Sequence, residues 1–137
     1  MSIYIDSNIF IFAALGAADD PRTARSKDIL ESVIEGKEVA FTSLLTVDEV
    51  VWVIIKQKKD RQLAVGQGLR MHQLPIRLIP LTETISMRAL HLMKKYPHLS
   101  PRDSLHVSSC IDVRASNLVS DDSDFKDIKE IAHQGID

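Results

Sequence analysis

The sequence of 137 residues predicts an α/β domain with a mainly parallel sheet and helices on both of its faces. Short apolar runs alternate along the chain with longer segments in which apolar residues recur at helical spacing. The length suits one compact domain that buries a core without disulfides. Apolar residues make up 45% of the chain and charged residues 26%, which is the balance of a globular protein and not of a disordered one.

The N-terminal part is predicted to begin with a strand and two helices. Residues 2 to 5 alternate weakly as a strand, and a helix can begin at Asp6 or Ser7. A second helix is expected in the segment PRTARSKDILESVIEGK, because Pro21 suits a first helical position and Gly36 lies near the end. This order of elements is typical of the first unit of an α/β fold.

The middle of the chain is predicted to add two strands and two helices. EVAFTS, residues 38 to 43, has the composition of a short strand, and apolar residues follow helical spacing over residues 46 to 59. Residues 60 to 74 form a weaker helical segment because two glycines lower its propensity. PIRLIPL, residues 75 to 81, is expected to be a short strand bounded by prolines.

The C-terminal third is predicted to contain two helices and a strand. Residues 85 to 96 carry a helical apolar stripe that breaks at Pro97. A helix over residues 101 to 113 follows, and NLVS, residues 117 to 120, is the last expected strand.

Several classes of protein are excluded. The run IFIFAALGAA has no basic residue before it and is preceded closely by Asp6, so we expect no signal peptide. No stretch approaches the ~20 apolar residues needed to cross a bilayer, and we expect no membrane association. The only cysteine, Cys110, cannot form an internal disulfide, so we expect an inert buried thiol and a cytoplasmic protein.

The net charge of −2 does not favour binding of a polyanion over the whole surface. A basic rim beside an acidic site would still allow it, and one segment could supply such a rim with Lys56, Lys58, Lys59, Arg61 and Arg70. The simpler interpretation of these residues is an exposed helix face.

Four acidic residues are expected to meet at one edge of the sheet. Asp6 and Asp122 directly follow predicted strands, Glu49 lies near the start of the helix after another strand, and Asp103 opens the helix after Ser100. In an open parallel sheet the strand-to-helix junctions share the carboxyl edge, where ligands bind at the switch in strand order. The four carboxylates therefore converge if this topology is correct.

Each acid also has a structural explanation. Asp6 can cap a helix, residues 46 to 49 match a capping box, residues 100 to 103 form a cap, and the acids within residues 121 to 124 suit a turn. A cap contributes about 1 kcal/mol, however, and Ser or Asn serves as well as Asp. Two carboxylates about 5 Å apart repel by roughly 3 kcal/mol at an effective dielectric constant of about 20. A hard divalent cation such as Mg²⁺ would offset this repulsion.

Other motifs are absent. The five histidines show no paired ligand spacing, which argues against zinc, and most are expected to be surface or packing residues. Neither GxxxxGK[ST] nor GxGxxG occurs, so no nucleotide-binding fingerprint is present.

Four segments together resemble PIN-domain proteins: IDSNIF at 5 to 10, VDEVVW at 47 to 52, SPRDSLHVSSC at 100 to 110 and LVSDDSDF at 118 to 125. The likeness covers nearly the whole chain, and within the family it is strongest to VapC-type toxin ribonucleases of toxin–antitoxin pairs. The resemblance implies a three-layer α/β/α sandwich in a single domain over residues 1–137. It also implies an endoribonuclease that depends on Mg²⁺ or Mn²⁺, forms a homodimer and is restrained by a cognate antitoxin.

The resemblance also assigns roles to individual residues. The catalytic, metal-binding acids would be Asp6, Glu49, Asp103 and Asp122. A fifth acid, Asp124, matches an additional position that binds a second metal or orients a water.

Polar residues beside the acids also match the family pattern. Asn8 and Ser120 are expected to hydrogen-bond to the metal-binding acids. Asp121 stands at a variable position, and it replaces Asp122 if the register is off by one.

The expected reaction is metal-assisted hydrolysis of RNA phosphodiesters, with single-stranded or looped RNA as substrate. One rival is a receiver-like phosphoacceptor domain, which needs a lysine after a late strand; Lys126 and Lys129 are only loosely placed for this role. A second rival is a non-catalytic binding module whose acids are helix caps. The helix at 46 to 59 is apolar nearly all round, with Trp52 opposite Val47, which indicates either a homodimer or antitoxin contact or a second layer of core.

Overall fold

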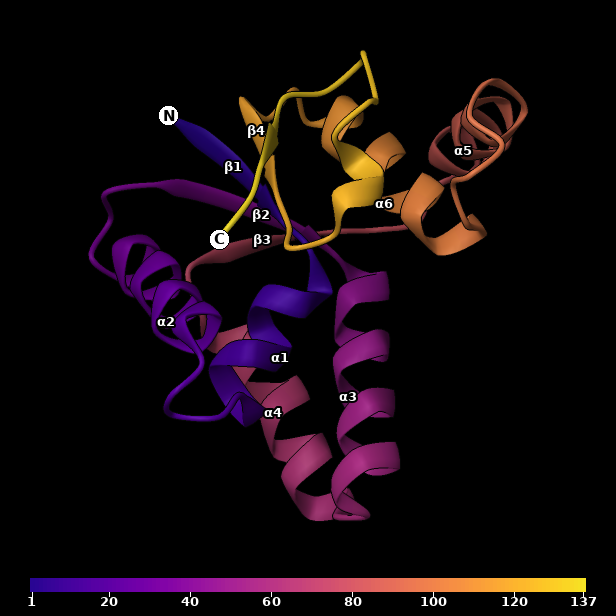
Figure 1. The fold of residues 1–137 in the computed structure, drawn as a ribbon. Coiled ribbons are helices and arrows are strands. Elements are labelled where there is room, and N and C mark those ends of the chain that lie inside the picture. The colour runs from indigo at the N-terminus through magenta and orange to yellow at the C-terminus, as the bar shows by residue number, and fades with distance from the viewer.

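The computed structural model describes residues 1–137 as a five-stranded parallel sheet flanked by six α-helices, with strand order β3-β2-β1-β4-β5 (Figure 1). The strands are β1 (Ser2–Ile5), β2 (Val39–Ser43), β3 (Ile76–Ile79), β4 (Asn117–Val119) and β5 (His133–Gln134). The helices are α1 (Ser7–Leu15), α2 (Pro21–Ile34), α3 (Leu44–Lys58), α4 (Arg61–Gln73), α5 (Glu83–Lys95), α6 (Pro101–Asp112) and the short 3₁₀-helix η1 (Ser123–Phe125).

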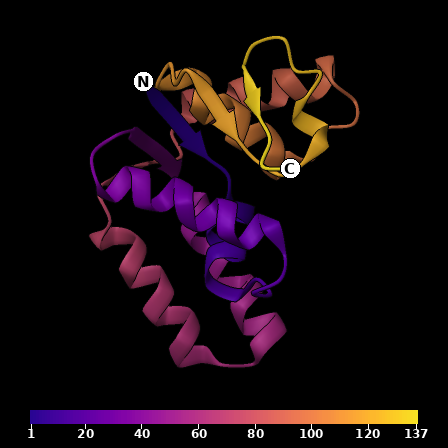
Figure 2. The same ribbon diagram turned by 60° about the vertical axis from the view of Figure 1, so that its left-hand side comes forward.

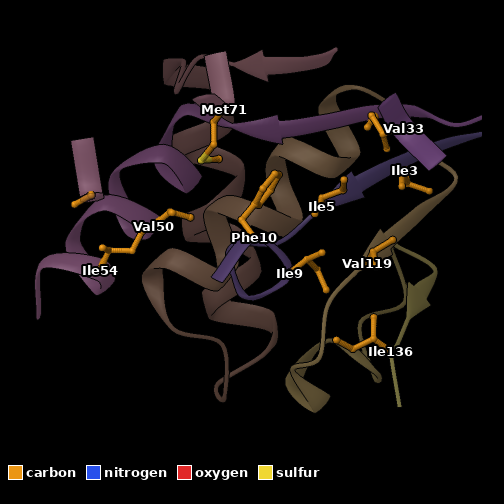
Figure 3. Close-up of a cluster of buried hydrophobic side chains, with 12 residues drawn as sticks. Ile3, Ile5, Ile9, Phe10, Val33, Val50, Ile54, Met71, Val119 and Ile136 are labelled. Carbon is orange, nitrogen blue, oxygen red and sulfur yellow. The ribbon is translucent and has the colours of Figure 1, made fainter. Parts of the chain in front are cut away.

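The sheet separates two layers of helices. Helices α1 to α4 lie on one side of it, and α5, α6 and the short helix η1 lie on the other, as the turned view in Figure 2 also shows. The alternation of strand β1 explains why both faces are covered. Ile3 and Ile5 join the core cluster beneath α1 to α4 (Figure 3), whereas Tyr4 joins the cluster with α5 and α6. The predicted α/β/α sandwich is confirmed.

The order of the strands places the switch point of the sheet between β1 and β4. The chain runs outward from β1 through β2 to β3, and then crosses back to the other side of β1 to form β4. The register pairs Ile5 with Val119, so the residues that follow, Asp6 and Ser120, leave the sheet side by side. Ligands of open parallel sheets bind at such a reversal of strand order.

Helix α3 begins earlier than the sequence pattern predicts. Ser43 is its N-cap and accepts a hydrogen bond from the Leu45 amide at 3.0 Å. The predicted capping box at residues 46 to 49 is therefore wrong. Thr46 is fully buried, and its hydroxyl lies 2.7 Å from the Thr42 hydroxyl inside the fold, where it cannot cap a helix.

The lysines that could have supplied a basic rim lie away from the acids. Lys56, Lys58 and Lys59 lie at the hairpin between α3 and α4, which is the end of α3 farthest from the sheet (Figure 1). Ten residues of helix, about 15 Å at 1.5 Å per residue, separate Glu49 from Lys59. These lysines are exposed, in keeping with the simpler interpretation.

Other sequence predictions can be compared directly. Cys110 is buried, and burial raises the pKa of its thiol to about 12, which confirms an inert thiol. No helix has the length and apolar character required to span a bilayer. Strand β5 was not predicted, because two residues are too few for a periodic pattern.

Candidate metal centre

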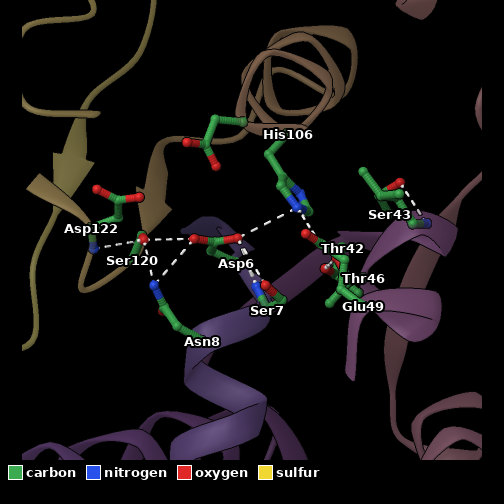
Figure 4. A network of polar contacts seen from close by, with 12 residues as sticks. Asp6, Ser7, Asn8, Thr42, Ser43, Thr46, Glu49, His106, Ser120 and Asp122 are labelled. Atoms are coloured by element: carbon green, nitrogen blue, oxygen red, sulfur yellow. Dashed lines mark hydrogen bonds and ion pairs between the residues drawn. The ribbon is translucent and has the colours of Figure 1, made fainter. Parts of the chain in front are cut away.

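Asp6 lies at the end of β1 and its carboxylate is held from two sides (Figure 4). One oxygen, Oδ1, accepts a hydrogen bond from the Ser7 amide at 2.7 Å and so caps α1. The other, Oδ2, accepts from the Ser120 hydroxyl at 2.7 Å and from the Asn8 side-chain amide at 3.3 Å. The residue is 5% exposed. Asp6 is therefore a buried and fixed carboxylate.

Ser120 joins the two chain segments that leave β1 and β4. Its hydroxyl donates to Asp6 and accepts from the Asp122 amide at 3.0 Å and from the Asn8 side chain at 3.0 Å. The Asn8 side-chain oxygen in turn accepts from the Asp121 amide at 3.3 Å. Asn8 and Ser120, which were expected to hydrogen-bond to the metal-binding acids, both contact Asp6 directly.

Glu49 reaches the centre from the second turn of α3 and meets a histidine there. The His106 Nε2 lies 2.6 Å from Glu49 Oε1 and 3.5 Å from Asp6 Oδ1. Its Nδ1 lies 2.7 Å from the Tyr4 hydroxyl. Burial opposes the charge on this imidazole, but the hydrogen bond to Glu49 and the charges of Asp6 and Glu49 raise its pKa above the ordinary value.

Most of the histidines were expected to be surface or packing residues, and His106 is an exception, since its side chain is 1% exposed and contacts two acids. One pattern in the sequence could have indicated it. His106 follows Asp103 by three residues on a predicted helix, so both side chains lie on the same face.

The remaining acids form a second group. Asp103, Asp122 and Asp124 each offer a carboxylate oxygen within 4.8 Å of the others. Asp103 stands in the first turn of α6, whose N-cap is Ser100. Asp122 Oδ1 accepts a hydrogen bond from the Asp124 amide at 2.9 Å, which fixes the turn after β4.

Asp103 links the two groups electrostatically. Burial, with a further contribution from the negative charges of Asp6 and Asp122, raises its pKa from 3.8 to about 6. Both carboxylates are therefore close enough to repel Asp103. The centre thus brings together the four acids predicted from the sequence, and Asp124 lies at its exposed edge.

Asp121 belongs to neither group. Its carboxylate pairs with the Arg22 guanidinium at 3.1 Å, and Arg22 also pairs with Asp20 at 2.8 Å. The register in which Asp121 takes the place of Asp122 is therefore not the one adopted in the structure.

The donor set fits a hard divalent cation. Five carboxylates gather at this edge, and no lysine or arginine forms an ion pair with any of them. Carboxylate oxygens are the ligands that Mg²⁺ and Mn²⁺ prefer. Burial first, and then the charges of Asp6 and Asp122, raise the pKa of Asp103 and so disfavour its charged form. A bound cation would favour the charged form.

A groove of about 360 Å³ lies away from the acids, lined from α1, α2, α3 and α4 by residues that include Phe10, Leu30 and Met71. None of the five acids lines this groove.

Replacing Ser120 by alanine is expected to weaken the binding of Mn²⁺ by about 10-fold or more, because hydrogen-bond partners of ligands tune affinity by about 10- to 100-fold. The change removes the hydroxyl donor to Asp6 Oδ2 and leaves the Asp122 amide without its acceptor, so we also expect the free energy of unfolding to fall by about 1 to 3 kcal/mol. Isothermal titration with Mn²⁺ and urea unfolding measure the two effects. Ser86→Ala, at an exposed position of α5, is the control. If the Ser120→Ala variant bound Mn²⁺ as tightly as the wild type, Ser120 would have no role in holding the metal-binding acids.

Comparisons with known proteins agree with this geometry. A model of the PIN domain family matches residues 3–131. Ribonuclease VapC7 of Mycobacterium tuberculosis (strain ATCC 25618 / H37Rv) is 26% identical over 132 residues, covering 96% of this chain and 89% of that protein. The structure of VapBC2 from Rickettsia felis bound to a DNA fragment from their promoter superposes with a TM-score of 0.75 at 18% identity, covering 98% of both chains.

A third similar protein is Mycobacterium tuberculosis VapC20, described as a Sarcin-Ricin loop cleaving toxin. Its crystal structure gives a TM-score of 0.70 at 15% identity, covering 85% of this chain and 86% of that one. Because the family model spans the chain from β1 to the segment before β5, and because relatives in sequence and structure are VapC proteins, the protein belongs to the PIN domain family and resembles its VapC-type toxin ribonucleases.

Proposed function

We propose that this protein is a divalent-metal-dependent endoribonuclease and the toxin of a type II toxin–antitoxin pair. The observation that carries the proposal is the gathering of five carboxylates, without a lysine or arginine partner, at the switch point between β1 and β4. The relatives support the choice of RNA, since VapC7 is named a ribonuclease and VapC20 is described as cleaving the Sarcin-Ricin loop.

Each acid has a proposed task. Asp6, Glu49, Asp103 and Asp122 hold Mg²⁺ or Mn²⁺, and Asp124 at the exposed edge holds a second ion or orients a water molecule. A bound ion of this kind activates water and stabilises negative charge on a phosphodiester. Asn8 and Ser120 keep the Asp6 carboxylate in place through their hydrogen bonds. No side chain of the protein acts as the nucleophile.

The proposed substrate is single-stranded or looped RNA, and the description of VapC20 as cleaving the Sarcin-Ricin loop supports this choice. A flexible strand can present a phosphodiester to an edge that a stiff duplex approaches less closely. The single free cysteine is in keeping with a protein of the reducing cytoplasm, where such RNA is found.

The test of this function is cleavage of end-labelled single-stranded RNA by the purified protein in Mn²⁺, with EDTA as the negative condition. Endonucleolytic fragments that require Mn²⁺ are the expected result. Mn²⁺ binding without cleavage of total cellular RNA would favour a non-catalytic binding module instead. The receiver-like alternative is set aside, because the chain belongs to the PIN domain family.

The proposed partners are an antitoxin and a second copy of the chain. The similarity to toxin–antitoxin complexes such as VapBC2 supports the antitoxin. Exposed apolar residues support the homodimer, because Trp52 on α3 is 53% exposed and Leu90 on α5 is 61% exposed. Since no second layer of core covers Trp52 within this chain, a contact with another chain is the better explanation of the apolar helix α3.

Replacing Trp52 by glutamate is expected to convert the dimer to a monomer, because exposed aromatic residues often anchor interfaces and a charge would be buried in their place. Sedimentation equilibrium measures the mass of the two proteins. Leu69→Glu, at an exposed apolar position of α4, is the matched control and should remain dimeric. A dimeric Trp52→Glu variant would exclude this face of α3 from the interface.

A further inference from the structure

His106 is a fully buried histidine that contacts two of the proposed metal ligands and is not one of the acids that define the family resemblance. Resting on the metal centre proposed above, we propose that His106 is a positioning residue and not a metal ligand. Its Nε2–H group holds the Glu49 carboxylate beside Asp6 and so sets the spacing of the metal-binding oxygens (Figure 4).

The location of the proton decides between ligand and positioning residue. An ionised carboxylate can only accept a hydrogen bond, so at 2.6 Å from Glu49 Oε1 the Nε2 atom must carry the proton. A protonated imidazole nitrogen has no free lone pair to give to a cation. Asp6 Oδ1 lies 3.5 Å from the same nitrogen, on the side where it can also interact with this proton.

The opposite side of the ring is fixed by Tyr4. Its hydroxyl lies 2.7 Å from His106 Nδ1, and the two rings meet edge to face at a centroid distance of 5.8 Å. A phenol hydroxyl at this distance can donate its proton to Nδ1, which leaves the ring proton on Nε2.

The chain of contacts from Tyr4 through His106 to Glu49 connects three elements of the fold. Tyr4 lies on β1 two residues before Asp6, His106 lies on α6 three residues after Asp103, and Glu49 lies on α3. The His106 imidazole thus connects β1, α3 and α6, the elements beside or within which Asp6, Glu49 and Asp103 lie. These residues are far apart in sequence, by 102 and 57 positions.

Glu49 depends on this contact more than the other acids do. Its hydrogen bond to His106 is the only one its side chain makes. Asp6, by contrast, accepts hydrogen bonds from the Ser7 amide, Asn8 and Ser120. Without the imidazole the long Glu49 side chain is free to turn away from the centre, and its carboxylate would be lost to the ion.

Two substitutions separate positioning from packing. His106→Leu fills a similar volume without a donor, whereas His106→Gln keeps an N–H donor on a flexible side chain. We expect the Kd for Mn²⁺ to rise about 10- to 100-fold in His106→Leu and to recover to within about threefold of wild type in His106→Gln. Mn²⁺ binding is followed by electron paramagnetic resonance, and His72→Leu, at an exposed position of α4, is the control.

The wild-type protein gives an independent readout if a variant does not fold. In ¹⁵N-resolved NMR spectra of the imidazole groups, His106 Nε2 should carry a proton before and after saturation with diamagnetic Mg²⁺. Loss of that proton on Mg²⁺ binding would make His106 a ligand and overturn the inference. So would a His106→Leu variant that binds Mn²⁺ like wild type. Wild-type protein that binds neither ion would instead overturn the proposed function, and the inference with it.

Discussion

Replacing Asp6 by asparagine is expected to lower metal-dependent RNA cleavage by about 10³-fold or more while leaving the protein folded. The substitution removes the negative charge of the most buried acid in the centre. Stabilisation by a correctly held metal ion contributes several kcal/mol to such reactions, and each 1.36 kcal/mol corresponds to about tenfold in rate. The fold should persist because asparagine caps a helix as well as aspartate does, and Asp6 is the N-cap of α1.

A matched control for this change is Asp60→Asn. Asp60 is likewise a helix N-cap, of α4, and its carboxylate accepts a hydrogen bond from the Leu63 amide at 3.0 Å far from the acids. Rates are compared under single-turnover conditions in Mn²⁺, and folding is checked by circular dichroism. If Asp6→Asn cleaved RNA at the rate of Asp60→Asn, Asp6 would have no part in catalysis.

Replacing Asp103 by asparagine is expected to stabilise the metal-free protein at neutral pH. Because the folded-state pKa of Asp103 is raised from 3.8 to about 6, the folded protein binds more protons than the unfolded chain between these values. Stability of the wild type therefore falls as pH rises from about 4 to 6, and the full penalty remains above pH 6. Each pKa unit is about 1.4 kcal/mol, and partial exposure reduces the effect, so we expect a gain of about 1 to 2 kcal/mol in Asp103→Asn at pH 7.5.

Urea unfolding in EDTA at pH 4 and at pH 7.5 measures this difference, with Asp48→Asn at an exposed position of α3 as the control. At pH 4 the gain should largely disappear, because Asp103 is then mostly protonated in the wild type. Adding Mn²⁺ at pH 7.5 should stabilise the wild type and have little effect on Asp103→Asn. Equal stability of the two metal-free proteins at pH 7.5 would show that the acids do not repel one another as described.

The layers of the fold could be predicted because local patterns determine them. Alternating apolar runs and helical stripes predicted four of the five strands and all six α-helices, since each element buries a face with a regular period. Asp6 and Asp122 could be placed at one edge for the same reason, because both follow strands that pair in parallel. The parallel direction alone brings their backbones together.

Other features depend on contacts that no local pattern encodes. Glu49 was expected in a first helical turn, where a capping box was assumed, but it lies in the second turn of α3, which begins at Leu44. His106 is joined by hydrogen bonds to Tyr4 across 102 positions of the chain and to Glu49 across 57, so the sequence separation carries no information about these two contacts. The ion pair between Asp121 and Arg22 spans 99 positions and likewise could not be predicted from a local pattern.

The most direct test of a shared cation is a crystal of the protein soaked in Mn²⁺ and measured near the manganese absorption edge. An anomalous difference peak is expected between the carboxylates of Asp6, Glu49, Asp103 and Asp122, with oxygen atoms at bonding distance. A peak bound elsewhere, or no peak at this edge at saturating Mn²⁺, would contradict the assignment of these acids as metal ligands.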